Sequence, residues 1–278
     1  MLTYIFSFLA FVTLYKGIKI FFGWRKKLKP VKIMRGAEPI YYKRGKTGVL
    51  FFHGFTSSPC DYKYLSKYLA DRGITVYVPL IDGHGRTPEH LASKGYRDWI
   101  RCAERAYKRL RKDVNKIYVG GDSFGGSLAI IIASRFEVDG VISMATPVFF
   151  KKERLFKIVF PFLSFFKDYQ KKWYHSALGT KLISERVTYD RIPLRCVKHV
   201  LKVIREGIIN MKDITVPILI MQSTADFGLS NRSVDYIATH TRSRKKKIVW
   251  IPNAYHVFII DKGKERSFRE IYKFIKET

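Results

Sequence analysis

The sequence predicts an α/β fold in which helices flank a mostly parallel β-sheet, with an inserted helical cap and an N-terminal hydrophobic segment. Short apolar runs typical of buried strands alternate with amphipathic stretches at helical spacing, which predicts parallel strands joined by helical crossovers. This alternation breaks after residue 146, and the chain begins with fifteen uncharged residues. We therefore expect a membrane anchor at 1–24, a basic linker at 25–37, a first core part at 38–146, a helical cap at 147–212 and a second core part at 213–278.

The first core part contains the clearest alternation of strands and helices. The run 47–54 (TGVLFFHG) is apolar and ends in a turn, as a fully buried strand should. The stretch 96–114 places its apolar residues near one face of a helix. In this part we predict strands at 38–45, 47–54, 74–80, 116–122 and 140–146, and helices at 58–73, 96–114 and 124–136.

The predicted cap is aromatic and basic, and the core pattern resumes after it. Residues 149–175 (FFKKERLFKIVFPFLSFFKDYQKKWYH) are helix-like and carry many phenylalanines and lysines. Such a stretch suits an interfacial helix that meets acidic lipid, and it equally suits a cap that packs over the core. After the cap we predict strands at 216–223 and 246–252 and helices at 231–240 and 264–277.

The stretch 119–130 (VGGDSFGGSLAI) places Ser123 between a buried strand and a helix of small residues. Residues 121–125 form the pattern G-x-S-x-G, which in this setting holds a serine on a turn so sharp that its neighbours must lack side chains. The turn also directs the helix N-terminus at the serine, which favours developing negative charge. The alternative is a glycine turn with an idle serine. The context favours Ser123 as a nucleophile.

A serine nucleophile needs a base and an acid that orients the base. Asp226 follows the predicted strand 216–223, and His256 follows the strand 246–252. Both therefore lie at carboxyl ends of strands, where open α/β sheets build their sites, and in the order Ser, Asp, His. Three other aspartates are less well placed. Asp213 precedes its strand, Asp235 lies within a predicted helix, and Asp261 follows the histidine.

The developing oxyanion also needs donors, and backbone N–H groups supply them. One is expected from Phe124, the residue after the nucleophile, and the other from Phe55, which follows the sharp turn at His53 and Gly54. His53 itself is predicted to be structural. The predicted chemistry needs no metal and no cofactor.

These residues resemble the serine hydrolases of the α/β-hydrolase fold, and within them bacterial carboxylesterases and monoacylglycerol lipases. The resemblance covers roughly residues 48–278 and rests on HGFTSSP, YLADRGITVYVPLIDGHG, YRDWI, GGDSFGG, ITVPILIMQSTAD and NAYHVFIID. It implies Ser123 as nucleophile, Asp226 as orienting acid, His256 as general base and acid, and Phe55 and Phe124 as oxyanion donors. Two positions depart from the family: Tyr255 replaces the usual glycine before the histidine, and Asp82 replaces a common proline or arginine.

The resemblance implies hydrolysis of a carboxylic ester through an acyl-enzyme on Ser123. Together with the aromatic cap and the N-terminal segment, it favours a lipid-like substrate such as an acylglycerol or a lysophospholipid. A thioesterase or an acyltransferase would use the same three residues. A membrane-tethered binding module without catalysis is a further alternative, which the complete set of three residues argues against.

The composition bears on partners and location. The chain carries 52 Lys and Arg against 23 Asp and Glu, a formal charge of +29. This excess favours an anionic membrane surface, although a lysine-rich proteome would also explain it. Nucleic-acid binding is disfavoured because no recognition helix, stacking sheet or Arg-rich groove is evident. Three scattered cysteines indicate reduced thiols rather than a disulfide framework.

The N-terminal segment predicts membrane association. Fifteen uncharged residues are too few to span a bilayer, but the stretch to Trp24 is long enough if Lys16 and Lys19 extend to the headgroups. Basic residues follow the segment and none precedes it, which favours a catalytic domain on the cytoplasmic side. A helix that folds onto the domain is the alternative. Spanning and lying on the membrane both stay open, as does the oligomeric state.

Overall fold

The computed structural model describes residue 14 and residues 30–172 and 186–278. Nearly all of the predicted anchor at 1–24 and the first residues of the basic linker lie outside the described residues. Within the described part of the chain, no helix combines the length and the apolar character needed to cross a membrane.

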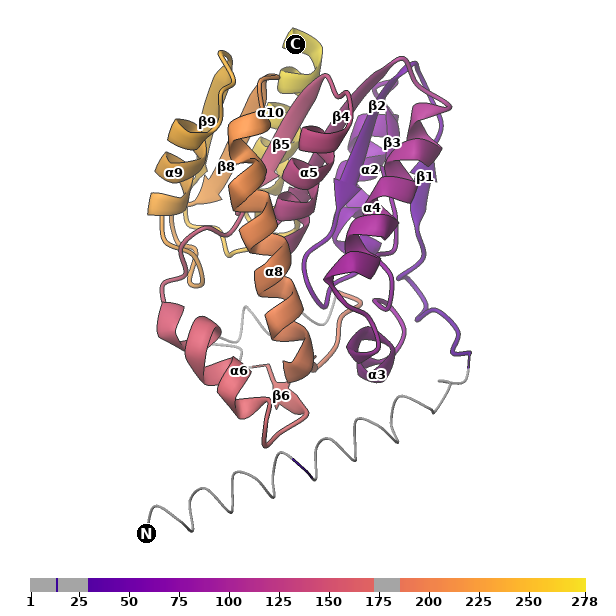
Figure 1. The fold of residues 1–278 in the computed structure, drawn as a ribbon. Coiled ribbons are helices and arrows are strands. Elements are labelled where there is room, and N and C mark those ends of the chain that lie inside the picture. The colour runs from indigo at the N-terminus through magenta and orange to yellow at the C-terminus, as the bar shows by residue number, and fades with distance from the viewer. Residues whose placement is uncertain (1–13, 15–29, 173–185) are drawn as a thin grey trace.

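A seven-stranded sheet forms the centre of the fold, and it confirms the predicted α/β architecture (Figure 1). The strand order is β1-β3-β2-β4-β5-β8-β9, and every neighbouring pair is parallel except β1 with β3. The sheet's strands are β1 Ile40–Tyr42, β2 Thr47–Phe52, β3 Thr75–Val78, β4 Lys116–Asp122, β5 Gly140–Met144, β8 Ile218–Ser223 and β9 Lys246–Ile251.

Helices cover both faces of the sheet. Helices α4, α5, α8 and α9 lie on one face, and α2 and α10 lie on the other (Figure 1). The helices are α2 Lys63–Ala70, α3 Pro88–Ala92, α4 Tyr96–Arg111, α5 Phe124–Arg135, α6 Phe160–Leu163, α8 Leu194–Asn210, α9 Arg232–His240 and α10 Lys264–Glu277. Short helical turns are η1 Pro59–Tyr62, η2 Leu155–Val159, η3 Met211–Asp213 and η4 Phe258–Ile260.

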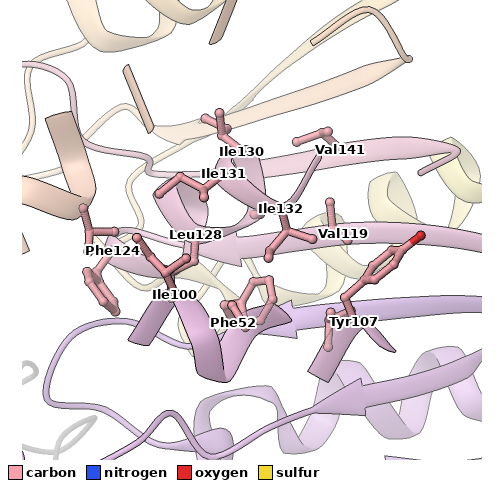
Figure 2. Close-up of a cluster of buried hydrophobic side chains, with 14 of the residues drawn as sticks. Phe52, Ile100, Tyr107, Val119, Phe124, Leu128, Ile130, Ile131, Ile132 and Val141 are labelled. Atoms are coloured by element: carbon pink, nitrogen blue, oxygen red, sulfur yellow. The ribbon is translucent and has the colours of Figure 1, made fainter. Parts of the chain in front are cut away.

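The core consists of two apolar clusters, one on each face of the sheet. Alternate residues of a strand enter different clusters: Phe52 packs with α4 and α5, whereas Phe51 packs with α2 and α10. Figure 2 shows the first cluster, in which α5 contributes Ile130 to Ile132. Helix α5 is buried on nearly all sides because it lies between the sheet and α8. The strand that leads into Ser123 and the helix that follows it are therefore held rigidly.

The segment between β5 and β8 differs from the rest of the fold. It contains η2, α6, a small antiparallel ribbon of β6 Tyr169–Lys171 and β7 Arg191–Pro193, and the long helix α8. The ribbon is absent from the elements that the sequence predicts. Helix α8 packs against α5 of the core, where a Cβ on Gly207 would lie 3.1 Å from Ser127 Cβ. The predicted cap at 147–212 thus includes a helix that completes one layer of the core.

The order of the strands places the site. The chain runs from β2 outward to β3 and then returns to β4 on the other side of β2. Open α/β sheets bind their ligands at such a switch point, outside the carboxyl ends of the strands. Phe55 follows β2, and Ser123 follows β4. Asp226 and His256 follow β8 and β9, so the sheet brings the carboxyl ends of all four strands to one edge.

Candidate active site

Ser123 occupies a strained backbone conformation between β4 and α5. Its φ of 52° and ψ of −121° lie in a region that residues with a side chain rarely adopt. The conformation is held from both sides, since the Ser123 N–H donates to the Met144 carbonyl at 2.8 Å and the Gly126 N–H donates to the Ser123 carbonyl at 2.9 Å. Ser123 is only partly buried, whereas its neighbours Asp122 and Phe124 are buried. The turn therefore presents the hydroxyl at the carboxyl edge of the sheet.

The glycines around Ser123 are required by close backbone contacts. A Cβ on Gly125 would lie 1.9 Å from the Phe52 carbonyl oxygen, and one on Gly121 would lie 2.3 Å from the Gly125 carbonyl. A Cβ on Gly126 would lie 2.0 Å from Thr146 Oγ1. All three distances are shorter than any real contact allows. The glycine pattern thus lets helix α5 start directly against β2 and β4.

Asp226 is fully buried and accepts four hydrogen bonds. Its Oδ1 accepts from the N–H groups of Gly228 at 2.8 Å and Leu229 at 3.0 Å. Its Oδ2 accepts from Gln222 Nε2 at 2.9 Å and from His256 Nδ1 at 2.6 Å. Burial raises the pKa of this carboxyl, but the His256 charge and these hydrogen bonds outweigh it and lower the pKa below its usual value. Asp226 is therefore ionised at neutral pH.

His256 is oriented by Asp226 and lies, like Ser123, at the edge of the sheet formed by the carboxyl ends of the strands. Because Nδ1 donates to Asp226, the Nε2 atom of the neutral ring is an acceptor. Burial lowers the pKa of His256, but the Asp226 carboxylate raises it overall. Asp122, the residue before Ser123, also raises it through its charge, so the turn of Ser123 is within electrostatic reach of the ring. The 20 % exposure of the side chain leaves His256 open to the surface.

The loop that carries His256 is anchored on both sides. The Tyr255 N–H donates to Asp261 Oδ2 at 2.5 Å, and the Asn253 N–H donates to Thr224 Oγ1 at 3.1 Å. Asn253 has a φ of 53°, which turns the chain back toward β8. Asp261, one of the weaker acid candidates from the sequence, thus holds the backbone next to His256 rather than its ring.

The two predicted oxyanion donors are unpaired backbone groups. Within residues 30–172 and 186–278, neither the Phe55 N–H nor the Phe124 N–H donates a hydrogen bond. Their side chains are locked together, with ring centroids 6.0 Å apart and with Trp99 packed against both. The aromatic contacts hold the two side chains without using the N–H groups. Two free donors therefore flank the carboxyl ends of β2 and β4.

His53 is structural, as the sequence predicts. Its ring is fully buried, with Nδ1 3.0 Å from the Gly54 carbonyl and Nε2 accepting from the Ile81 N–H at 3.2 Å. The second bond requires a neutral Nε2, so Nδ1 carries the proton and donates to Gly54. Burial lowers the pKa of His53 to about 4. The ring therefore holds the turn before Phe55 in place through two hydrogen bonds, and it takes no part in proton transfer.

Asp122 is a second buried carboxyl beside Ser123. Its Oδ1 accepts from the Tyr62 hydroxyl at 2.8 Å, and its Oδ2 has no hydrogen-bond partner among the described residues. The Tyr62 oxygen also lies 3.1 Å from the Phe52 carbonyl, and a single phenol proton serves only one of these acceptors well. Burial, followed by the Asp61 charge, raises the pKa of Asp122 to about 6. Folding thus makes Asp122 a weaker acid, and its carboxyl ionises at a higher pH than that of an exposed aspartate.

This shift predicts a pH-dependent stability. The pKa of Asp122 is about 6 in the folded protein and 3.8 for an unperturbed aspartate, so between these pH values the folded state binds a proton that the unfolded chain has released. We expect Asp122 to contribute up to about 3 kcal/mol of stability at low pH that is lost over this window, and D122N to lack this contribution. The difference in unfolding free energy between D122N and wild type, from urea titrations at pH 4 to 7, should therefore grow with pH. The exposed Asp235→Asn serves as control, and a flat difference for D122N would contradict the prediction.

The structure adds residues that the sequence argument missed. Gln222 supports Asp226, and it could have been noticed as a polar residue inside the apolar run of β8. Lys151 donates to the Asp226 carbonyl at 2.5 Å, and residues 149–151 pair with 228–230 as a short ribbon. Asp61 and Arg186 form a buried ion pair next to the Phe55 loop. No local sequence pattern predicts the ion pair of Asp61 and Arg186.

The remaining candidate residues take no part in this arrangement. Asp213 and Asp235 are exposed on other elements. Cys102 and Cys196 are buried, and burial raises the pKa of each thiol to about 12, as expected for packing residues. Within the described ranges, no cluster of three or more His, Cys, Asp or Glu side chains could hold a metal ion.

Comparison with known proteins gives matches along most of the chain. A carboxylesterase of Bacillus subtilis (strain 168) is 25 % identical over 241 residues, which cover 86 % of this chain and 96 % of the relative. A thermostable monoacylglycerol lipase of Bacillus sp. (strain H-257) is 27 % identical over 233 residues, covering 82 % and 90 %. A solved structure from work on the metagenome-derived lipolytic enzymes LipS and LipT has a TM-score of 0.77 at 25 % identity, covering 89 % of this chain and all of that one.

The family follows from a match that spans most of the fold. The model of the Hydrolase_4 family, described as serine aminopeptidase, S33, matches residues 44–263. This range runs from just before β2 to beyond His256, and it includes the turn of Ser123 and the Asp226 loop. The chain belongs to this family of α/β-hydrolases.

Proposed function

We propose that this protein, a carboxylic ester hydrolase of the esterase and monoacylglycerol lipase type, cleaves lipid-like esters through an acyl-enzyme on Ser123. One observation carries the proposal. A buried carboxylate, Asp226, holds the Nδ1 of His256 at 2.6 Å at the edge of the sheet where Ser123 is presented on a strained turn. The unpaired N–H groups of Phe55 and Phe124 flank the same edge and supply the oxyanion donors.

The first half of the reaction forms the acyl-enzyme. His256 Nε2 takes the proton of the Ser123 hydroxyl as its oxygen attacks the ester carbonyl carbon. Asp226 stabilises the resulting imidazolium, and the N–H groups of Phe55 and Phe124 donate to the negative carbonyl oxygen. His256 then gives its proton to the alcohol oxygen as the C–O bond breaks, and the alcohol leaves.

The second half returns the enzyme to its starting state. His256 takes a proton from a water molecule, whose oxygen attacks the acyl carbon. The tetrahedral charge is again held by the two backbone donors. His256 returns the proton to Ser123 Oγ as the acid leaves. Since both halves need His256 neutral at the start, hydrolysis should rise with pH through the raised pKa of this ring.

An exposed apolar face on the cap supports a lipid-like substrate. Five large apolar side chains in η2, in α6 and in the turn after α6 are 39–64 % exposed: Ile158, Val159, Phe162, Phe165 and Phe166. Exposed cations lie in the same stretch of the chain, at Lys151, Lys152, Arg154, Lys157 and Lys167. We call these ten residues the cap face. One of the relatives is a monoacylglycerol lipase, which supports an acylglycerol or a similar ester as the substrate.

The test is hydrolysis of p-nitrophenyl esters of increasing acyl chain length by the wild type and by Ser123→Ala. We expect wild-type activity with a preference for medium or long chains, and a loss in Ser123→Ala of about 10⁴-fold or more. A Ser123→Ala protein as active as wild type would overturn the assignment of the nucleophile. A folded wild type that cleaves no ester but cleaves acyl thioesters would instead favour a thioesterase.

We further propose that the protein is membrane-associated, with its catalytic domain on the cytoplasmic side and the cap face against anionic lipid. The exposed apolar residues with surrounding cations suit an interfacial surface, because apolar side chains enter the acyl boundary while cations meet acidic headgroups. The basic residues after the predicted anchor support the same orientation.

Vesicle flotation tests this second proposal. A chain starting at residue 30, which lacks the predicted anchor, should float with phosphatidylglycerol vesicles better than with phosphatidylcholine vesicles, and less so at high salt. The triple change Phe162→Ser, Phe165→Ser and Phe166→Ser should reduce flotation. Ile209→Ser, an exposed apolar residue on α8, is the matched control. Equal flotation of the triple variant and wild type would contradict the role of the cap face.

A further inference from the structure

Three residues between β6 and β7, 186–188, form hydrogen bonds to the loop that carries Phe55. Arg186 donates from Nε and Nη2 to the two carboxylate oxygens of Asp61 at 2.8 and 2.5 Å. Thr188 Oγ1 donates to the Thr56 carbonyl at 2.7 Å, and Ser58 Oγ donates to the Val187 carbonyl at 2.7 Å. We call residues 186–188 the clasp. It joins two parts of the chain that lie about 130 positions apart in sequence.

The ion pair of the clasp is buried, and each of its two side chains makes a further hydrogen bond. The Asp61 side chain is fully buried, and that of Arg186 is 18 % exposed. Arg186 Nη2 also donates to Ser57 Oγ at 3.1 Å, and Ser57 Oγ in turn donates to Asp61. Two parallel N–H···O bonds between a guanidinium and a carboxylate fix direction as well as distance. Arg186 therefore sets the position of both Ser57 and Asp61.

The loop that carries Phe55 has a strained backbone that includes the oxyanion donor. Thr56 has a φ of 63°, and the Ser57 N–H donates to the Gly54 carbonyl at 3.1 Å, which closes a tight turn around Phe55. The core holds the start of this turn through His53, whereas its end is held through Thr56, Ser57 and Asp61 by the clasp. Residues with φ above zero persist only where their surroundings hold them. The direction of the Phe55 N–H thus depends on contacts from both sides.

We propose that Arg186 is a positioning residue that orients the Phe55 N–H by holding Asp61 and Ser57. The oxyanion site is then complete only when the clasp is bound to the Phe55 loop. This inference rests on the proposed esterase function for its catalytic consequence. The clasp is part of the segment inserted between β5 and β8, so residues of this segment contribute to transition-state stabilisation as well as to the fold.

Arg186 also lies close enough to the site to act through its charge. Its guanidinium lowers the pKa of His256 and of Asp122, although other groups have larger effects on both. The positive charge would favour the negative oxygen that forms next to Phe55. A lysine at position 186 keeps this charge but makes no paired bond to Asp61. Comparing lysine with methionine therefore separates charge from positioning.

The experiment uses R186M, R186K, D61N and the double variant R186M/D61N in the full chain. R186M leaves the buried Asp61 carboxylate unpaired, which lowers stability on its own. The double variant removes both charges, so its melting temperature should recover toward that of wild type. We expect kcat for p-nitrophenyl esters to fall about 10- to 100-fold in R186M, R186K and the double variant, with a small change in KM.

A matched control and a readout without catalysis complete the test. Arg135→Met removes an arginine that pairs with Glu104 and Glu206 at the far end of α5, and it should leave kcat unchanged. Amide hydrogen exchange of residues 54–61 should be faster in R186M and in the double variant, and unchanged in Arg135→Met. If kcat of the double variant recovers together with its melting temperature, Arg186 has only a structural role and the proposal is overturned.

Failure of this inference differs from failure of the proposed function. A wild type without Ser123-dependent ester hydrolysis would overturn the function. In that case the rate at which a fluorophosphonate labels Ser123, which also needs the oxyanion donors, replaces kcat. Unchanged exchange of residues 54–61 in R186M would overturn the clasp whatever the activity. Faster exchange with an unchanged kcat or labelling rate would overturn the positioning role.

Discussion

Replacing Asp226 with asparagine is expected to lower kcat for ester hydrolysis by about 10⁴-fold without unfolding the chain. The reason lies in the hydrogen bonds of the carboxylate. Oδ1 accepts from two backbone N–H groups, so the asparagine oxygen must stay at that position. The amide NH₂ then faces His256 Nδ1, which has to become an acceptor. The ring proton moves to Nε2, and His256 can no longer take the proton of Ser123.

The measurement is kcat and KM for a p-nitrophenyl ester across pH 6 to 9, together with thermal unfolding. Gln222 can turn its amide over to accept from the new NH₂, so the melting temperature should stay near that of wild type. Asp235→Asn, on the exposed face of α9, is the matched control and should keep full activity. Retention of most of the activity by Asp226→Asn would show that another group orients His256.

Replacing Gly125 with alanine should give a large loss of stability. The new Cβ would lie 1.9 Å from the carbonyl oxygen of Phe52 and 2.6 Å from its carbonyl carbon, both in the backbone of β2. This strand pairs with β4 through residues 47–52, so it cannot move without breaking the centre of the sheet. We expect the free energy of unfolding to fall by about 3 kcal/mol or more, measured by urea titration.

Gly95→Ala is the control for this prediction. Gly95 precedes helix α4, and a Cβ there would meet the ring of His199 at 3.5 Å, an ordinary contact. The cost should stay within about 1 kcal/mol. If the two alanine variants lose equal stability, the close approach of α5 to β2 is not the reason for glycine at position 125.

The order of elements could be predicted because local patterns carry it. The strands are apolar runs, and the longer helices that flank them show one buried face, so their bounds differ from the expected ones by only a few residues. Ser123 and its glycines form a pattern that predicts a sharp turn between a strand and a helix. Asp226 and His256 follow strands that can be recognised as apolar runs. The extent of the cap as a separate unit stays a prediction, because α8 lies within 147–212 and packs on α5.

The contacts around the site could not be predicted from local patterns. Arg186 reaches Asp61 across 125 positions, and Tyr62 reaches Asp122 across 60. A charged residue in an irregular segment has no periodicity that would identify its partner. Burial gives these contacts their energy, and burial exists only after the segment between β5 and β8 has folded against the core.

The sequence by itself thus determined the fold class and the strand ends that carry Ser123, Asp226 and His256, because hydrophobic periodicity and glycine patterns act over a few residues. Only the tertiary structure decided that Asp226 accepts a hydrogen bond from His256 Nδ1 at 2.6 Å, that the pKa of Asp122 is raised, and that Arg186 holds the Phe55 loop. Each of these depends on which side chains share a buried space, and the packing of distant segments sets that.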